Sequence, residues 1–141
     1  METVALREDK LINEGNILRH HKFATTYYDE ELKIAGVKWH GSFSTEEYIE
    51  LFNQFIEDVK GKEVIGFYSD IREQGVVPVA ARKHFEKVFS PKGKEIGIDK
   101  TGVVTDASPF KKYYLNTLIK VTKRPAKLCS NPEEALEFIL T

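Results

Sequence analysis

Apolar runs of strand length alternate with amphipathic runs of helix length along most of this 141-residue chain. Two extended segments, 17–28 and 32–39, flank a short acidic turn and predict an antiparallel hairpin. Apolar runs at 64–68, 101–105 and 126–129 follow, separated by helical patterns. Strands that alternate with helices form parallel sheets through crossover connections. The sequence therefore predicts an α/β fold, a five-stranded mixed sheet with an N-terminal antiparallel hairpin and about four flanking helices.

The strongest helical signal begins at Ser44. Ser44 and Glu47 have the spacing of a capping box, in which each side chain satisfies the other residue's backbone amide. Further helices are predicted after Pro78, from Ser108 and from Asn131. Ser90-Pro91 is expected to disturb the helix that follows Pro78. The first helix places one apolar stripe inward: Tyr48, Leu51, Phe52, Phe55, Ile56 and Val59.

Composition and the N-terminus define the broad class of protein. A hydrophobic fraction of 41% excludes a disordered chain. The chain has no apolar run long enough to span a bilayer. Residues 1–10 carry mixed charge without an apolar stretch, so we expect no secretion signal there. The lone Cys129 forms no internal disulfide, so we expect a cytoplasmic protein. Because no apolar run is long enough, we also expect that the protein is not transmembrane. Residues 1–15 are expected to be an extension or short helix, and 16–141 a single domain.

The sequence contains no catalytic, metal or cofactor motif. Its histidines, His20, His21, His40 and His84, lack metal-ligand spacing, so we predict no metal site. Glycine-rich phosphate-binding motifs are also absent, so no cofactor is predicted. Cys129 lies in a short strand, where a buried thiol is expected rather than a nucleophile. We therefore predict no catalytic residue.

Basic residues gather between Lys111 and Lys127, with Tyr113 and Tyr114 among them. This combination also occurs in nucleic-acid-binding surfaces. The sequence pI of about 6.4 argues against that function, and a solvated helix face explains the lysines. We predict no nucleic-acid partner.

Asp70 and Arg72 follow a predicted central strand, and Trp39 ends the hairpin. Ligands in open α/β sheets bind beyond the carboxyl ends of the strands. These three residues are therefore the candidate ligand-binding residues. A structural alternative is that Asp70 caps the backbone after it while Arg72 pairs with a surface acid.

Four segments together resemble the SpoIIAA-like branch of the STAS domain superfamily, which shares its architecture with CRAL-TRIO lipid-binding domains. They are 37–48, the strand end at 70–72, 101–105 with Phe110 after it, and 131–140. Each motif is weak alone, but the order and spacing of the four motifs match the family. The resemblance spans residues 20–140. The resemblance implies a STAS-like fold and a non-catalytic protein.

The chain departs from the pattern of anti-sigma-factor antagonists, which carry a phosphorylatable serine after the Asp-ended strand. Segment 70–78 contains no Ser or Thr, so a kinase-driven switch there is not expected. We expect a regulatory module that binds a small apolar, lipid-like or amphipathic ligand, or a protein partner. The alternatives are a homodimeric interaction protein and an enzyme of unrecognised type.

Overall fold

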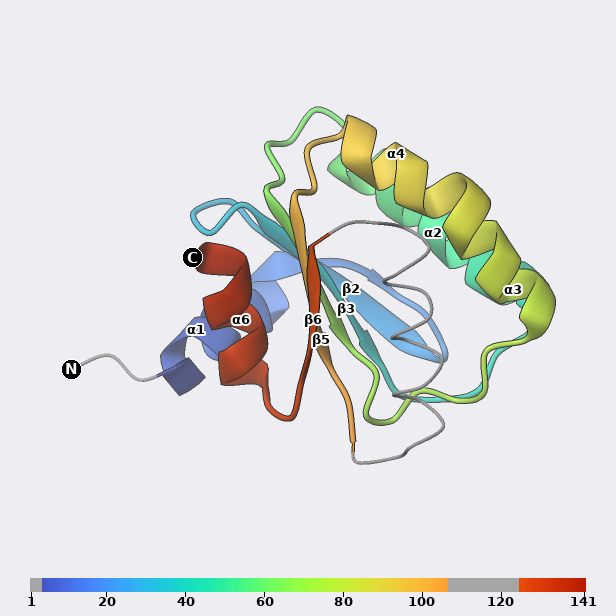
Figure 1. Ribbon diagram of the computed structural model, residues 1–141, viewed down its shortest axis with the longest axis horizontal. Coiled ribbons are helices and arrows are strands. Elements are labelled where there is room, and N and C mark those ends of the chain that lie inside the picture. The colour runs from blue at the N-terminus through green and yellow to red at the C-terminus, as the bar shows by residue number, and fades with distance from the viewer. Residues whose placement is uncertain (1–3, 107–124) are drawn as a thin grey trace.

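The computed structural model describes residues 4–106 and 125–141, whose centre is one six-stranded sheet (Figure 1). Neighbouring strands in this sheet are also neighbours along the chain. The pairs among the first three strands are antiparallel, and the later pairs are parallel, which confirms the mixed sheet and its N-terminal hairpin. The strands are β1 (Ile17–His20), β2 (Ala24–Asp29), β3 (Ile34–Trp39), β4 (Gly66–Asp70), β5 (Lys100–Val104) and β6 (Ala126–Cys129).

The sheet has one more strand than predicted, because segment 17–28 forms two strands rather than one. In the turn between β1 and β2, the His21 N–H donates to the Ala24 carbonyl at 2.7 Å. Residues 21–24 contain none of the Gly, Pro, Asn or Asp that usually mark a turn. The sequence pattern alone therefore gave no sign of a break.

Helix α2 (Thr45–Val59) begins with the predicted capping box. The Glu47 N–H donates to Ser44 Oγ at 3.1 Å, and the Ser44 N–H donates to Glu47 Oε1 at 2.8 Å. These two bonds satisfy amides that the first turn of a helix leaves open. The predicted apolar stripe packs inward, with Tyr48, Leu51, Phe52, Phe55 and Val59 all buried.

The helix predicted after Pro78 continues through Ser90-Pro91, where the sequence predicts a disturbance. It consists of α3 (Val79–His84), one wide π turn η2 (Phe85–Phe89) and α4 (Ser90–Glu95). In the π turn the Ser90 N–H donates to the Phe85 carbonyl, five residues earlier. Proline has no N–H to donate to the preceding turn, and the wider turn ends at Phe89, two residues before Pro91.

Helices cover both faces of the sheet (Figure 1). Helices α2, α3 and α4 lie on one face, whereas α1 (Val4–Leu11) and α6 (Pro132–Leu140) lie on the other. Each face buries its own apolar cluster, and β4 contributes Phe67 to the first cluster and Tyr68 to the second. This division follows from the alternation of side chains along a strand. A short helical turn, η1 (Glu14–Asn16), joins α1 to β1.

The helix predicted from Ser108 lies outside the described residues. The same applies to most of its basic side chains, which are Lys111, Lys112, Lys120, Lys123 and Arg124.

Candidate ligand cavity

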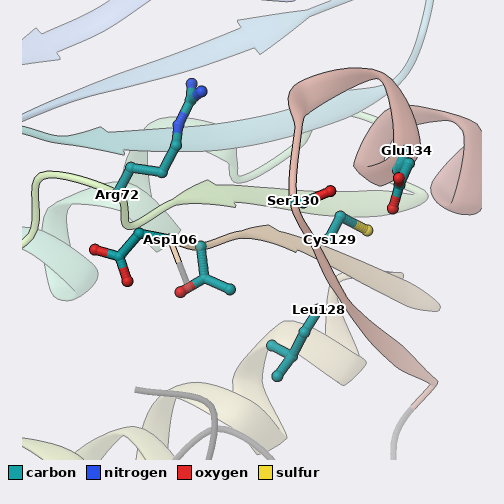
Figure 2. A pocket seen from close by; sticks show the side chains of 7 residues that line it. Arg72, Asp106, Leu128, Cys129, Ser130 and Glu134 are labelled. Carbon is teal, nitrogen blue, oxygen red and sulfur yellow. The ribbon is translucent and has the colours of Figure 1, made fainter. Parts of the chain in front are cut away.

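The carboxyl ends of β4, β5 and β6 meet at one edge of the sheet, where the structure has a cavity of about 340 Å³ (Figure 2). This volume lies within the usual range for small-molecule sites. We call it the strand-end cavity; its described lining residues are Arg72, Thr105, Asp106, Leu128, Cys129, Ser130 and Glu134.

Three chain segments leave the sheet together and form this cavity. The Ile71 N–H donates to the Val104 carbonyl, and the Thr105 N–H donates to the Cys129 carbonyl, both at 2.9 Å. These bonds continue the parallel pairing of the strands past their ends. The polar residues that follow these strands, Arg72, Asp106 and Ser130, are therefore brought to the same cavity.

Asp70 and Arg72 form a close ion pair at the end of β4. Asp70 Oδ2 accepts from Arg72 Nη2 at 2.6 Å, and Oδ1 accepts from Nε at 3.0 Å. Asp70 Oδ1 also accepts from the Arg72 backbone N–H at 3.2 Å. Hydrogen bonding to Asp70 raises the pKa of the guanidinium. Asp70 thus caps the backbone after it, and it is also the acid that pairs with Arg72.

Trp39 lies on the other face of the sheet from the Asp70–Arg72 pair. Its side chain is buried beneath α2, where the ring stacks on Tyr48 and Nε1 donates to Ser69 Oγ at 3.3 Å. Ser69 and Asp70 are consecutive residues of one strand and point to opposite faces. The structure therefore brings Asp70 and Arg72 together, but places Trp39 in the core and not in the strand-end cavity lining.

Thr105 carries a buried hydroxyl in the cavity lining. Only 4% of the residue is exposed, and Oγ1 has no hydrogen-bond partner among the described residues. An unpaired buried hydroxyl costs about 1–3 kcal/mol of stability. A group from a bound molecule would remove this cost.

Glu134 and Cys129 both line the strand-end cavity, near the start of α6. The Glu134 N–H donates to Asn131 Oδ1 at 3.0 Å, which caps the helix that the sequence predicts from Asn131. The Glu134 carboxylate accepts from Asn131 Nδ2 at 3.3 Å. Burial raises the pKa of the Cys129 thiol, and the Glu134 charge acts in the same direction. Cys129 is therefore a buried, protonated thiol at neutral pH.

The candidate residues predicted from the sequence include few of the cavity residues, although the sequence carries a signal for two more of them. Asp106 and Ser130 come just after the apolar runs of β5 and β6, as Arg72 does after β4. The strand-end rule that selected Arg72 applies equally to them. Glu134 gives no such signal, because acidic residues are common in the first turn of any helix.

The histidines lie away from the strand-end cavity lining. His20 Nδ1 and His40 Nε2 lie 3.2 and 3.5 Å from Thr25 Oγ1, on the hairpin strands. Within residues 4–106 and 125–141, no three His, Cys, Asp or Glu side chains are grouped so as to hold a metal ion. No helix in these ranges is both long and apolar enough to cross a membrane.

Comparisons with known proteins identify a similar solved structure. Neither the protein-family models nor the curated proteins contain a match to this chain. Among solved structures, the chain is similar to an uncharacterised protein of the DUF3478 family with a SpoIIAA-like fold, from Shewanella loihica PV-4. The match covers 87% of this chain and 89% of that one, with 17% sequence identity and a TM-score of 0.60. The chain therefore has the SpoIIAA-like fold that the sequence resemblance predicts.

Proposed function

We propose that this STAS-like module is a non-catalytic binding protein that holds a small amphipathic ligand in the strand-end cavity. The observation that carries the proposal is the buried, unpaired hydroxyl of Thr105, a residue that lines a cavity of about 340 Å³. Leu128 offers apolar surface in the same cavity, and Arg72 offers a charged group. Apolar walls with a few convergent polar groups are typical of small-molecule sites.

The lining chemistry supports binding rather than catalysis. Acyl or group transfer needs a nucleophile activated by a lowered pKa or by a neighbouring base. Burial raises the pKa of Cys129, which disfavours the reactive thiolate. No histidine is among the described lining residues, so an imidazole base is absent from this part of the cavity.

The experiment is native mass spectrometry of the full chain purified gently from cells. We expect an added mass that leaves on denaturation, and a smaller loaded fraction in Arg72→Ala. Arg19→Ala is the matched control, because Arg19 also forms a two-bond ion pair, with Asp58, but does not line the cavity. Arg72→Lys keeps a positive charge beside Asp70, and thermal melting shows whether each variant folds.

Two outcomes contradict the proposal. A wild-type chain that carries no added mass argues against a small ligand acquired in the cell. Equal loading of the wild type and Arg72→Ala removes Arg72 from the binding site.

Exposed apolar side chains favour a second function, self-association. Val76 is 77% exposed and Val79 is 59% exposed, just before and at the start of α3. Large apolar side chains that are close together and exposed often mark interaction surfaces. We expect a homodimer that Val76→Asp weakens, measured by size-exclusion chromatography with light scattering. A strict monomer at high concentration contradicts this function.

A further inference from the structure

Two neighbouring helices on one side of the sheet carry opposite charge (Figure 1). Helix α2 contains five acidic and no basic residues. The continuous helix formed by α3, η2 and α4, which we call the α3–α4 helix, contains five basic and two acidic residues. The ring of Phe52 in α2 packs against it, with centroid distances of 5.4 Å to Phe85 and 4.2 Å to Phe89. An acidic helix therefore lies beside a basic one.

The exposed acids of α2 lie along one stripe of the helix. Glu46, Glu50 and Glu57 are all exposed. Spacings of four and seven residues place side chains above one another on the same side of a helix. This stripe is opposite to the buried stripe of α2, which contains Leu51 and Phe55. The three acids, which we call the acidic row, therefore point away from the sheet.

The α3–α4 helix presents a row of its own. Lys83 and Lys87 are exposed, and each lies two residues from a buried one, Ala81 and Phe89. Residues two positions apart lie on opposite sides of a helix, so both lysines also point away from the sheet. We call them the basic row. Val79, which is 59% exposed, lies one turn before Lys83 and extends the row with an apolar side chain.

The two rows are not used up within one chain. The ion pairs among residues 4–106 and 125–141 include no member of either row. A surface with one row of each sign would repel part of any partner that is uniformly charged, such as an anionic membrane or a nucleic acid. It suits a partner that carries the same two rows, and a second copy of this chain does.

The direction of the two helices decides how a second copy binds. Helix α2 leads from the end of β3 to the start of β4, and the α3–α4 helix leads from the end of β4 to the start of β5. These strands are parallel, so the two helices run in the same direction. A twofold axis between the helices and parallel to them places α2 of each copy over the α3–α4 helix of the other. A twofold axis across the helices would instead place α2 over α2, with like charges together.

The charges also lie at matching levels along the two helices. Phe52 contacts both Phe85 and Phe89, so it lies level with Lys87, midway between them. Glu50 comes two residues earlier, which places it at a level between Lys83 and Lys87. In the parallel twofold arrangement, the acidic row of one copy therefore lies opposite the basic row of the other.

We propose that the chain forms a twofold-symmetric dimer in which the acidic row of each copy binds the basic row of the other. This inference rests on the self-association proposed above and adds the surface and the symmetry of the dimer. The paired charges set the orientation of the two copies. Val79 lies at the end of the basic row, so the same contact covers exposed apolar surface.

The salt dependence of the wild-type dimer is the first test. Sedimentation equilibrium at several NaCl concentrations gives the dissociation constant. We expect this constant to rise between about 0.05 and about 0.5 M NaCl, because salt screens exposed charges. A dissociation constant that does not change with salt overturns the pairing of the rows.

Charge reversal tests each row separately. One variant combines Glu50→Lys with Glu57→Lys, and the other combines Lys83→Glu with Lys87→Glu. Each variant places like charges at both contacts of the dimer. We therefore expect each to weaken self-association at least about tenfold.

The matched control combines Asp9→Lys with Glu137→Lys. It changes the net charge as much as the reversal of the acidic row, at exposed residues of α1 and α6 on the other face of the sheet. We expect the dissociation constant of the control to equal that of the wild type. Thermal melting shows whether each variant folds.

A mixture of the two reversed variants gives the sharpest test. In a mixed dimer, the new lysines of one chain meet the new glutamates of the other, and the native rows meet at the second contact. We expect the equimolar mixture to dimerise at a concentration at which each variant alone is monomeric. If the mixture stays monomeric, the two rows do not contact each other.

The remaining outcomes separate this inference from the function on which it rests. If the wild type is a strict monomer at high concentration, self-association and the pairing of the rows both fail. If the wild type dimerises and Val76→Asp weakens the dimer, but neither reversal does, self-association stands and the proposed surface is wrong. If the control weakens the dimer as much as the reversals do, net charge and not the rows explains the effect.

Discussion

Thr105 and Tyr68 each carry a buried hydroxyl without a hydrogen-bond partner among the described residues, yet their surroundings differ. Thr105 lines the strand-end cavity, whereas Tyr68 lies in the apolar cluster beneath α1 and α6. A binding site gains from a polar group that a ligand can satisfy, and a packed core does not. The two hydroxyls therefore lead to different expectations.

Thr105→Val removes the hydroxyl and nearly preserves the shape of the side chain. We expect the free energy of unfolding to rise by about 1 kcal/mol, because the unpaired buried group is lost. We also expect a smaller ligand-loaded fraction. Urea denaturation and native mass spectrometry measure the two quantities. Lower stability together with unchanged binding would show that the hydroxyl serves the fold instead.

Tyr68→Phe is expected to raise the free energy of unfolding by about 1 kcal/mol, for the same reason. Tyr68 is 0% exposed, and burial raises the pKa of its phenol. The residue is outside the strand-end cavity lining, so the ligand-loaded fraction in native mass spectrometry should not change. A loss of stability on urea denaturation would contradict the prediction and indicate a buried water on the hydroxyl.

At the scale of elements, helix α6 lies directly against the sheet because glycines allow it. A Cβ on Gly102 would lie 2.6 Å from the Ala135 carbonyl oxygen, which belongs to the α6 backbone. A Cβ on Gly66 would also meet Ile139 of the same helix. Two neighbouring strands thus present bare backbone where the helix packs.

Gly102→Ala is expected to destabilise the fold by about 1–3 kcal/mol, because the helix backbone must move to make room. Gly15→Ala is the control, since its Cβ would meet only the Asn13 side chain, at 3.3 Å. Urea denaturation of both variants tests the difference. If Gly102→Ala costs no more than Gly15→Ala, α6 can shift freely on the sheet.

Local signals made most of the described elements predictable from the sequence. The capping box at Ser44 identifies α2, and Asn131 identifies α6. The turn between β1 and β2 was missed, because no residue type in it marks a turn. The π turn before Pro91 was also missed, since it depends on the backbone of the preceding helix.

Only the part of the candidate site that lies at the end of a single strand could be predicted from the sequence. Asp70 and Arg72 belong to one segment, so their proximity follows from the sequence. Trp39 lies on another strand, and Lys38, not Trp39, pairs with Asp70. Which face a side chain shares with a residue of a neighbouring strand depends on this register. The alternation of apolar and polar residues in the sequence does not determine this register.

At the scale of the whole molecule, the balance of folded and unfolded chains depends on pH through His21. Burial lowers the pKa of His21, and the positive charge of Arg19 lowers it further. The folded state therefore favours the neutral imidazole, whereas the unfolded chain binds a proton near the ordinary histidine pKa of 6.5. Above pH 6.5 the preference of the folded state for neutral His21 costs no stability. As the pH falls below 6.5 toward the folded pKa, protonation of the unfolded chain lowers the free energy of unfolding.

His21→Gln is expected to flatten the acid side of the stability profile. The free energy of unfolding of the wild type should fall more steeply than that of the variant between neutral pH and about pH 5. Chemical denaturation at several pH values measures both curves. Parallel curves would show that His21 titrates alike in the folded and unfolded chains.

The strand order has a consequence for the sequence of events in folding. Each strand pairs with the strand made just before it, so the sheet can grow in the direction of synthesis. Leu11 of α1 is the exception, because it shares its buried cluster with Ala135 and Leu136 of α6. The first helix of the fold cannot complete its packing until the last has emerged from the ribosome.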